Sequence, residues 1–334
     1  MNGLDPSTEP RPAEDDHPPM SEPNPSGDPG PATAGVSTAD TVTAGAAAPD
    51  VTPPLSRTVR FAWGMVIAIV IGLIALVIYV FTRPPPTESG TSSLPTPPAV
   101  VSAVASVPAS VFAAVGAQVT AKPTPLTPPH LLTGQPRLVL HGKPEVLYVG
   151  AEYCPFCATE RWPLVVALSR FGHFTGLEDT QSAGTSVFAS IQTFSFADTR
   201  FDSPYLSFTG VELYSDELDA DGGYAKLDTL TPAQESLVAR YGNAAGPSAT
   251  AIPFVDIGNR MVATTSPFTP GILTRQSQGD IVAALDEPGT LTGQAVIVGA
   301  NQLTAGICQV TGQRPAAVCD SKGVRDANAA LGLA

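Results

Sequence analysis

Positive charge is scarce in this sequence. The 334 residues include 17 Lys and Arg against 30 Asp and Glu, which gives a formal net charge of −13 at pH 7. Proteins that bind nucleic acid draw most of their affinity from cations that neutralise phosphates, and the sequence has no basic stripe. The composition therefore argues against nucleic acid as a partner.

Several catalytic motifs are missing as well. The sequence contains no Gly-rich phosphate loop, no Gly-x-Ser-x-Gly elbow and no His-Glu-x-x-His motif. The sequence therefore lacks the residues that usually carry out phosphoryl transfer, serine-hydrolase chemistry and zinc-peptidase chemistry. We expect no cofactor and no metal.

Aromatic side chains are almost absent from the first 56 residues. This acidic stretch is rich in Pro, Ala, Ser and Thr, and its one aromatic ring is that of His17. Such a composition cannot bury enough apolar surface to offset the entropy of ordering the chain. We predict a disordered tail over residues 1–56. The Pro-rich residues 84–130 are predicted to be a semi-extended linker.

One long segment lacks charge altogether. Phe61–Phe81 is built mainly from Val, Ile, Leu and Ala, with Trp63 and Tyr79 near its ends. About 20 apolar residues cross the hydrocarbon core of a bilayer as a helix, and aromatic residues gather at both interfaces. A buried core helix would not have Pro-rich flanks on both sides, and a signal peptide would lie near the N-terminus. The sequence predicts one transmembrane helix with its flanks over residues 57–83, and hence a lipid bilayer as partner.

Cysteine is rare, and all of it follows the predicted span. The four cysteines are Cys154, Cys157, Cys308 and Cys319. An even number confined to one side of a membrane fits an oxidising compartment. Two arginines precede the span and one follows it, which agrees with the excess of positive charge on cytoplasmic flanks. We therefore predict a single-pass protein of the cell membrane with a cytoplasmic N-terminus and an extracytoplasmic C-terminal domain.

The remaining residues, 131–334, carry mixed α and β patterns and are long enough for a proper core. Strands are predicted over residues 137–150, 191–196 and 207–213, a hairpin over 251–263, and helices over 155–171, 231–241, 278–285, 293–308 and 321–332. A polar insertion covers about 214–250, and a helical extension covers about 288–334. This order indicates an α/β fold of the α+β type with a mixed sheet, not a doubly wound fold.

The sharpest chemical signal is Tyr-Cys-Pro-Phe-Cys over residues 153–157, between a predicted strand and a predicted helix. A helix N-terminus stabilises a thiolate, which is the attacking species in disulfide exchange. We predict Cys154 as the exposed catalytic nucleophile and Cys157 as the resolving thiol. A zinc site would need two more closely spaced ligands, and Cys308 and Cys319, with ten residues between them, fit that poorly.

Residues 151–157, Pro163 in the following helix, and Ile252-Pro253 ahead of a hairpin and a helix together resemble the thioredoxin superfamily. The likeness covers roughly residues 137–287, with an insertion. In that superfamily a cis-proline faces the redox cysteines and helps to bind the substrate chain. The resemblance implies this role for Pro253, with Ile252 presenting backbone groups to a peptide. The whole chain is also similar to an uncharacterised family of membrane-anchored thioredoxin-like proteins of bacteria and archaea, which supplies no assigned activity.

Two features depart from thioredoxin itself. Six residues before the first cysteine, where thioredoxin has a buried Asp, this sequence has Tyr148, a poor base at neutral pH. Pro155-Phe156 replaces the Gly-Pro dipeptide and is closer to the dipeptides of oxidising or isomerising relatives. Both departures argue against a general reductase of the cytosolic type.

Three weaker candidates surround the motif. Glu152 and Glu160 flank it and could shuttle protons, but we predict that both are solvated, as acids in a first helical turn often are. His173 is predicted to be a favourable charge near the C-terminal end of the same helix, not a catalyst.

The second cysteine pair is predicted to be a structural disulfide. Cys308 lies late in an apolar helical stretch, and Gly312 and Pro315 turn the chain back before Cys319. The alternative is a second redox relay that reloads the first pair.

The sequence thus predicts a membrane-anchored, extracytoplasmic thiol–disulfide oxidoreductase or isomerase that acts on protein thiols and disulfides. It is compatible with either redox direction and with a membrane electron-transfer partner. The alternative is a redox-inactive thioredoxin-like binding or assembly module, or a redox sensor, tethered to the membrane.

Overall fold

The structure, a computed structural model, describes part of the chain: Gly72 and residues 94–122, 124–242 and 251–333. The chain divides into two compact units, residues 1–78 and 79–334, and all the helices and strands given below belong to the second. The predicted tail and, apart from Gly72, the predicted transmembrane helix lie outside the described residues.

Within the described part of the chain, no single helix combines the length and the apolar composition needed to cross a membrane. Two short helices, α2 (Pro98–Ala105) and α3 (Ala109–Val115), meet that test only together, and the chain bends by 60° between them. Val104 of α2 and Phe112 of α3 are buried in the main hydrophobic core.

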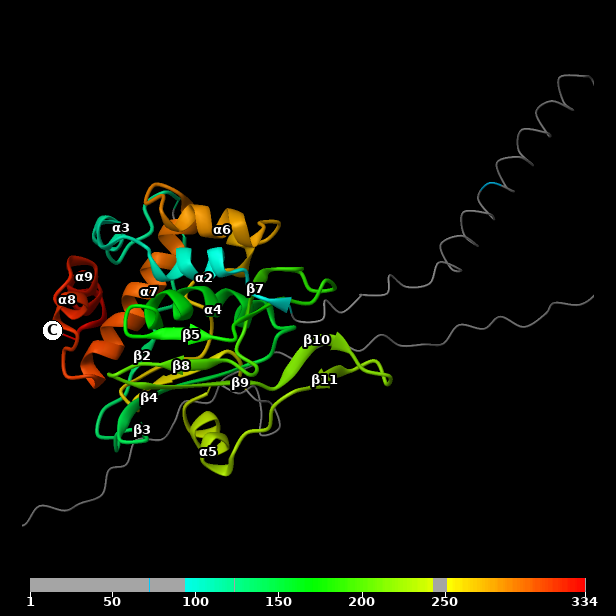
Figure 1. The fold of residues 1–334 in the computed structure, drawn as a ribbon, viewed down its shortest axis with the longest axis horizontal. Helices are drawn as coiled ribbons and strands as arrows, with labels where there is room; N and C mark the ends of the chain where they lie inside the picture. Colours follow the sequence, from blue (N-terminus) through cyan, green and yellow to red (C-terminus); the bar gives the residue numbers. More distant parts are fainter. Residues whose placement is uncertain (1–71, 73–93, 123, 243–250, 334) are drawn as a thin grey trace, which may run out of the picture. The chain divides into compact units, whose positions relative to one another are not determined.

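A mixed sheet runs through the domain (Figure 1). Its six strands are β2 (His130–Leu131), β3 (Val139–Leu140), β4 (Lys143–Gly150), β9 (Ser207–Glu212), β12 (Phe254–Ile257) and β13 (Met261–Ala263). β4 pairs with β9 in parallel and with β12 and β3 antiparallel, and β13 joins β12 to β2. The mixture of helices with a mixed sheet agrees with the predicted fold class.

The helices lie largely where the sequence pattern predicts them. They are α4 (Pro155–Leu168), α5 (Pro232–Tyr241), α6 (Gln278–Leu285), α7 (Leu291–Val310), α8 (Ala316–Cys319) and α9 (Lys322–Leu331), with a 3-10 turn η1 (Pro270–Ile272). Thr231 and Gln234 form the expected capping box at the start of α5, in which each side chain accepts a hydrogen bond from the other residue's backbone N–H.

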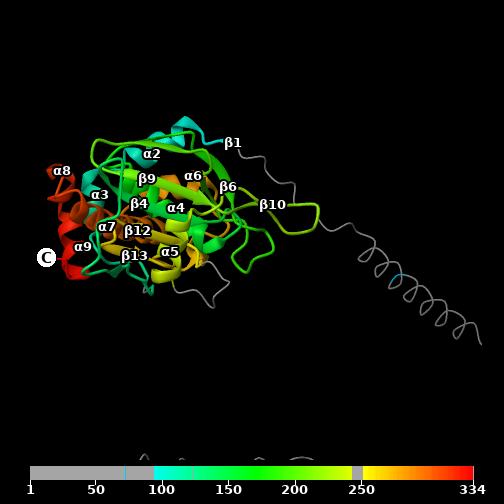
Figure 2. The same ribbon diagram turned by 90° about the horizontal axis from the view of Figure 1, so that it is seen from below.

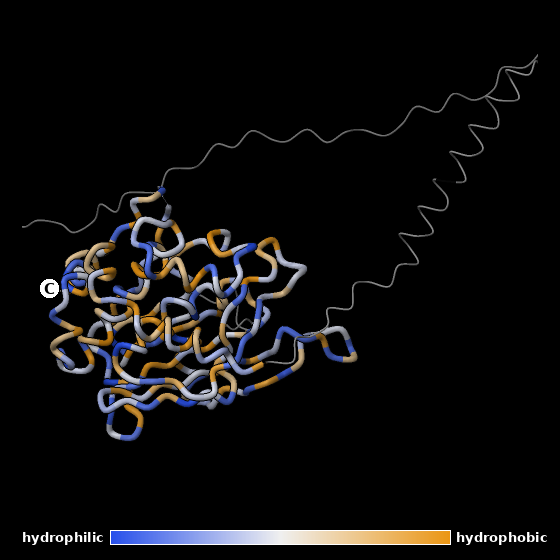
Figure 3. Tube along the Cα trace, turned by 45° about the horizontal axis from the view of Figure 1, so that its top comes forward, coloured by the Kyte–Doolittle hydropathy of each residue, from blue (hydrophilic) through white to orange (hydrophobic). Residues whose placement is uncertain are grey.

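Alternate side chains of β4 enter two different cores. Val146 and Tyr148 pack with α4 and α7, whereas Leu147 and Val149 belong to a second core that contains Val238 of α5. This follows from the two-residue repeat of a strand, because neighbouring side chains point to opposite faces. Figure 1 shows α5 on one side of the sheet and α4 and α7 on the other, and Figure 3 shows hydrophobic and hydrophilic stretches alternating along the chain.

Smaller strands surround the central sheet. They are β1 (Leu94–Pro95), β6 (Glu178–Gln181) and β7 (Gln192–Ser195), which pair in that order, the pair β5 (His173–Thr175) and β8 (Arg200–Asp202), and the hairpin β10 (Tyr214–Leu218) and β11 (Tyr224–Lys226).

The prediction that His173 lies at a helix end is wrong. α4 ends at Leu168, and His173 opens β5 with its ring exposed and 3.9 Å from the Asp202 carboxylate.

The predicted linker is also wrong over its described part. Residues 94–122 and 124–130 include α2 and α3, whose apolar sides enter the core. Asn301 of α7 fastens α3, because its Nδ2 donates to the carbonyl oxygens of Phe112 at 3.1 Å and Gly116 at 2.8 Å. Figures 1 and 2 show α3 beside α9. Pro97 and Pro98 lie at the start of α2 and Pro108 is the N-cap residue of α3, positions where proline is well tolerated.

We expect Asn301→Ala to lower the free energy of unfolding by about 1–3 kcal/mol, because two buried carbonyls lose their donor. Chemical denaturation of the full-length protein gives the measurement, and Ser102→Ala on the exposed side of α2 is the control. Equal stability of Asn301→Ala and the unchanged protein would show that this contact does not hold α3 to the domain.

Candidate redox site

The two cysteines of the motif lie at the junction of β4 and α4. Cys154 is the N-cap residue of α4, and its Sγ accepts a hydrogen bond from the backbone N–H of Cys157 at 3.3 Å. Cys157 is completely buried, and Cys154 keeps 7% of its surface exposed. Cys154 is less accessible than predicted because Tyr153, Tyr214 and Ile252 pack around the pair. It is still the thiol of the pair that reaches the surface.

The pKa values of the two free thiols are shifted in opposite directions. Hydrogen bonding to Cys157 lowers the pKa of Cys154, burial opposes this, and the positive charge of Arg161 lowers it further, so that the net change is downward. Burial raises the pKa of Cys157 well above its usual value, and the neighbouring Cys154 adds to the rise. The thiolate form is therefore favoured at Cys154 and disfavoured at Cys157.

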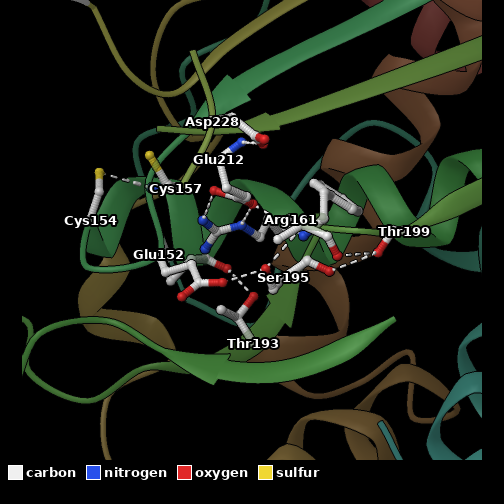
Figure 4. Close-up of polar contacts among 12 residues, drawn as sticks. Glu152, Cys154, Cys157, Arg161, Thr193, Ser195, Thr199, Glu212 and Asp228 are labelled. Atoms are coloured by element: carbon white, nitrogen blue, oxygen red, sulfur yellow. Dashed lines mark hydrogen bonds and ion pairs between the residues drawn. The ribbon is translucent and has the colours of Figure 1, made fainter. Parts of the chain in front are cut away.

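A buried ion pair lies under the cysteines. Arg161 Nε donates to Glu212 Oε1 at 2.9 Å and Arg161 Nη2 to Glu212 Oε2 at 2.6 Å, and neither side chain is exposed (Figure 4). Burial by itself would lower the pKa of Arg161, but the Glu212 carboxylate more than compensates and holds it well above its usual value. The guanidinium therefore stays charged. Its Nη1 has no hydrogen-bond partner among the described residues.

No local pattern in the sequence indicates this ion pair. Arg161 lies on α4 and Glu212 at the end of β9, 51 residues later, so only the parallel pairing of β4 with β9 brings them together. The one hint in the sequence is Arg161 itself, a charged residue one helical turn after Cys157 on a helix that is predicted to face the core.

The prediction that Glu152 and Glu160 are solvated is wrong. Both are buried, with 4% and 1% of their surface exposed. α4 packs between β7 and α7, so positions that would face water on an isolated helix lie inside. Glu152 Oε1 accepts a hydrogen bond from Ser195 Oγ. The Glu160 carboxyl has no partner among the described residues, and burial raises its pKa well above its usual value.

Tyr148 of β4, six residues before Cys154, is completely buried. Burial raises the pKa of its hydroxyl well above the usual value, and Arg161, 5.6 Å from the ring centroid, opposes that rise. Tyr148 is therefore a poor base at neutral pH, as the sequence predicts.

The structure brings Ile252 to the cysteines, and Pro253 follows it in the chain. The peptide bond between them is cis, and Ile252 packs against the cluster formed by Ala151, Cys154 and Cys157. Pro253 directly precedes β12, whose first residue pairs with Val149 near the end of β4.

The tyrosines of the β10–β11 hairpin were not predicted from the sequence to lie beside the cysteine motif. The Tyr153 ring stacks on Tyr224 with a centroid distance of 4.2 Å and lies 6.3 Å from Tyr214. The Tyr214 carbonyl accepts the Glu152 N–H at 2.9 Å, which fixes the hairpin to the motif. A signal existed, because Asp-Gly-Gly at residues 221–223 is typical of a tight hairpin turn.

The remaining cysteines lie outside this cluster. Cys308 of α7 and Cys319 of α8 form a disulfide with their Cα atoms 5.6 Å apart, and both belong to the main core. The structure therefore keeps them separate from Cys154 and Cys157.

Comparison with known families gives one match. The profile of a family described as "Domain of unknown function (DUF929)" matches residues 134–309, more than half of the chain. The matched segment contains the cysteine motif, Arg161, Glu212 and Pro253. Comparison with curated proteins and with solved structures finds no match.

Proposed function

The chain belongs to the family described as a domain of unknown function (DUF929), and we propose that it is a membrane-anchored thiol–disulfide oxidoreductase with a thioredoxin-like domain. One observation carries this proposal. Two free thiols sit one helical turn apart with pKa values displaced in opposite directions, downward at Cys154 and upward at Cys157. A structural pair would need no such division between the two thiols.

The chemistry follows from that division. The Cys154 thiolate attacks one sulfur of a substrate disulfide, a mixed disulfide forms, and the other substrate sulfur leaves as a thiolate. Cys157 then attacks Cys154 Sγ, which forms the Cys154–Cys157 disulfide and releases the second substrate sulfur. The substrate gains the two electrons that the cysteine pair loses. Run in reverse, the same steps transfer a disulfide to the substrate.

Protein chains are the proposed substrates. Ile252 lies against the cysteine cluster and Pro253 follows it, where an extended chain could pass close to Cys154. Phe156, with 39% of its surface exposed, and the half-buried Tyr153 give this region apolar surface for a polypeptide. These contacts support the binding role that the thioredoxin resemblance implies.

The proposed location is the outer side of the cell membrane, with residues 57–83 as the anchor. The Cys308–Cys319 disulfide supports this side, because disulfides persist in oxidising compartments.

A trapping experiment tests function and location together. In cells that express the full-length Cys157→Ser protein, we expect protein adducts linked through Cys154, because the resolving thiol is gone and the mixed disulfide persists. They are detected as reductant-sensitive high-mass bands and identified by mass spectrometry. The matched control, Cys154→Ser with Cys157→Ser, should give none. Equal labelling of variant and control would refute the oxidoreductase, and adducts made only with cytoplasmic proteins would reverse the topology.

A further inference from the structure

We infer that Arg161 is a positioning residue for the resolving thiol: its buried guanidinium, held in place by Glu212, stabilises Cys157 as a thiolate during the second step of exchange. The inference rests on the proposed function, since it assigns a role within that reaction cycle.

The geometry places Arg161 for this task. It follows Cys157 by four residues on α4, so the two side chains share one face of the helix, one turn apart. Two of the three guanidinium nitrogens are used by Glu212, and Nη1 is left without a partner among the described residues. A fully buried donor without an acceptor is costly, and native structures rarely keep one without a reason.

Glu212 is itself fixed from several directions. Its Oε1 also accepts the backbone N–H of Phe196 at 3.3 Å, and its own N–H donates to Asp228 Oδ2 at 3.0 Å. The carboxylate is therefore held in place, and its two hydrogen bonds from Arg161 fix the guanidinium.

The charges around Cys157 determine the step of the exchange at which the Arg161 cation acts. The titratable groups that act on this thiol include Cys154 and Arg161 on its own helix, Tyr148 on β4 and Tyr153 beside the motif. Arg161 is the cation of this set, and its charge acts on both thiols. Once Cys154 is part of a mixed disulfide, its negative charge is gone, and Cys157 is the thiol of the pair that the guanidinium can still stabilise as a thiolate.

The step assisted by Arg161 balances as follows. The Cys157 thiol gives its proton to a base in the solvent, and its thiolate attacks Cys154 Sγ. The new sulfur–sulfur bond forms as the bond from Cys154 to the substrate sulfur breaks. That sulfur leaves with the electron pair and takes a proton from water.

An aromatic disulfide, 5,5′-dithiobis(2-nitrobenzoate), separates the two steps in the full-length protein. The first equivalent of released thionitrobenzoate reports attack by Cys154, and the second reports attack by Cys157 on the mixed disulfide. The pH midpoint of the second release gives the apparent pKa of Cys157. Free-thiol titration beforehand should give two thiols per chain, because Cys308 and Cys319 are joined.

Three variants test the role of the charge. Arg161→Met with Glu212→Leu removes both charges without leaving one buried and unpaired, and should raise the midpoint of the second release by about one unit and slow that release about tenfold at pH 7. Glu212→Gln should lower the midpoint, because the cation loses its counter-charge. Arg161→Lys should recover most of the rate that the double variant loses.

The opposite signs distinguish this role from a structural one. If the pair only supported packing, Glu212→Gln and the double variant would move the second release in the same direction, or leave its midpoint unchanged, and either result overturns the inference. If the double variant shows a normal first release and an unchanged second release, the role of Arg161 is refuted but the proposed function is not. Absence of the first release from the unchanged protein refutes the proposed function, and the inference with it.

Discussion

Trp162→Ala is expected to lower the free energy of unfolding by about 3–5 kcal/mol, the usual loss for removing a large buried aromatic side chain. Trp162 lies one residue after Arg161 on α4 and is completely buried. Its ring centroid is 4.6 Å from that of Phe194, and its Nε1 donates to the Gln192 carbonyl at 2.9 Å. Both partners are on β7, so this side chain fixes the helix of the redox motif to a strand.

Two further variants make the measurement specific. Trp162→Phe keeps a ring against Phe194 but leaves the Gln192 carbonyl without its donor, and should cost about 1–2 kcal/mol. Val187→Ala removes apolar atoms from a side chain that is 93% exposed and should change stability by less than about 0.5 kcal/mol. Chemical denaturation of the full-length protein gives all three values. A loss below about 1 kcal/mol for Trp162→Ala would show that α4 does not depend on this contact.

Elements with strong local signals could be predicted from the sequence. The start of α5 follows from Thr231 and Gln234, whose mutual hydrogen bonds depend on their spacing of three positions and little else. The β12–β13 hairpin follows from two apolar runs around Gly258-Asn259, where both residues adopt positive φ. The place of Cys154 at a strand-to-helix junction is similarly local.

Features that depend on distant partners could not be predicted. The composition of residues 94–122 indicates a linker, and only the packing of α2 against α6 and α4 and of α3 against α7 and α9 makes them parts of the domain. Acids in the first turns of a helix are solvated unless another element covers them, and the covering elements here, β7 and α7, are distant in sequence. The β10–β11 hairpin is mostly polar, so its strands lack the apolar alternation by which strands are recognised.

The same distinction applies to the candidate site. The two candidate redox thiols are close in sequence and were identified from it, and Arg161, whose charge lowers the pKa of both, follows on the same helix, whereas other side chains that surround the motif and Arg161 come from separate strands. Glu212, Tyr148 and Ser195 lie on β9, β4 and β7, and no spacing rule connects them. For such a site the sequence is enough to identify the candidate nucleophile, whereas the polar and charged groups around it become known only from the fold.

Removal of the second cysteine pair should separate stability from redox chemistry. We expect Cys308→Ala with Cys319→Ala to lower the free energy of unfolding by about 3 kcal/mol, because a bridge across 11 positions restricts the unfolded chain by about that amount in the chain-entropy model. The same variant should leave both phases of thionitrobenzoate release unchanged. Denaturation of the unchanged protein under strong reduction should approach the stability of the variant.

The reason for the separation is the position of the bridge in the fold. It ties the end of α7 to α8, which leads into α9, and α9 and α7 together hold α3. The bridge thus stabilises the end of the domain to which residues 94–122 are attached, while Cys154 and Cys157 form their own cluster beside Ile252. Under the relay alternative, the double variant would instead fail to reoxidise Cys154 and Cys157 in cells, and peptide mapping of unreduced protein would find Cys308 linked to one of them. Either finding would remove the structural assignment of this disulfide.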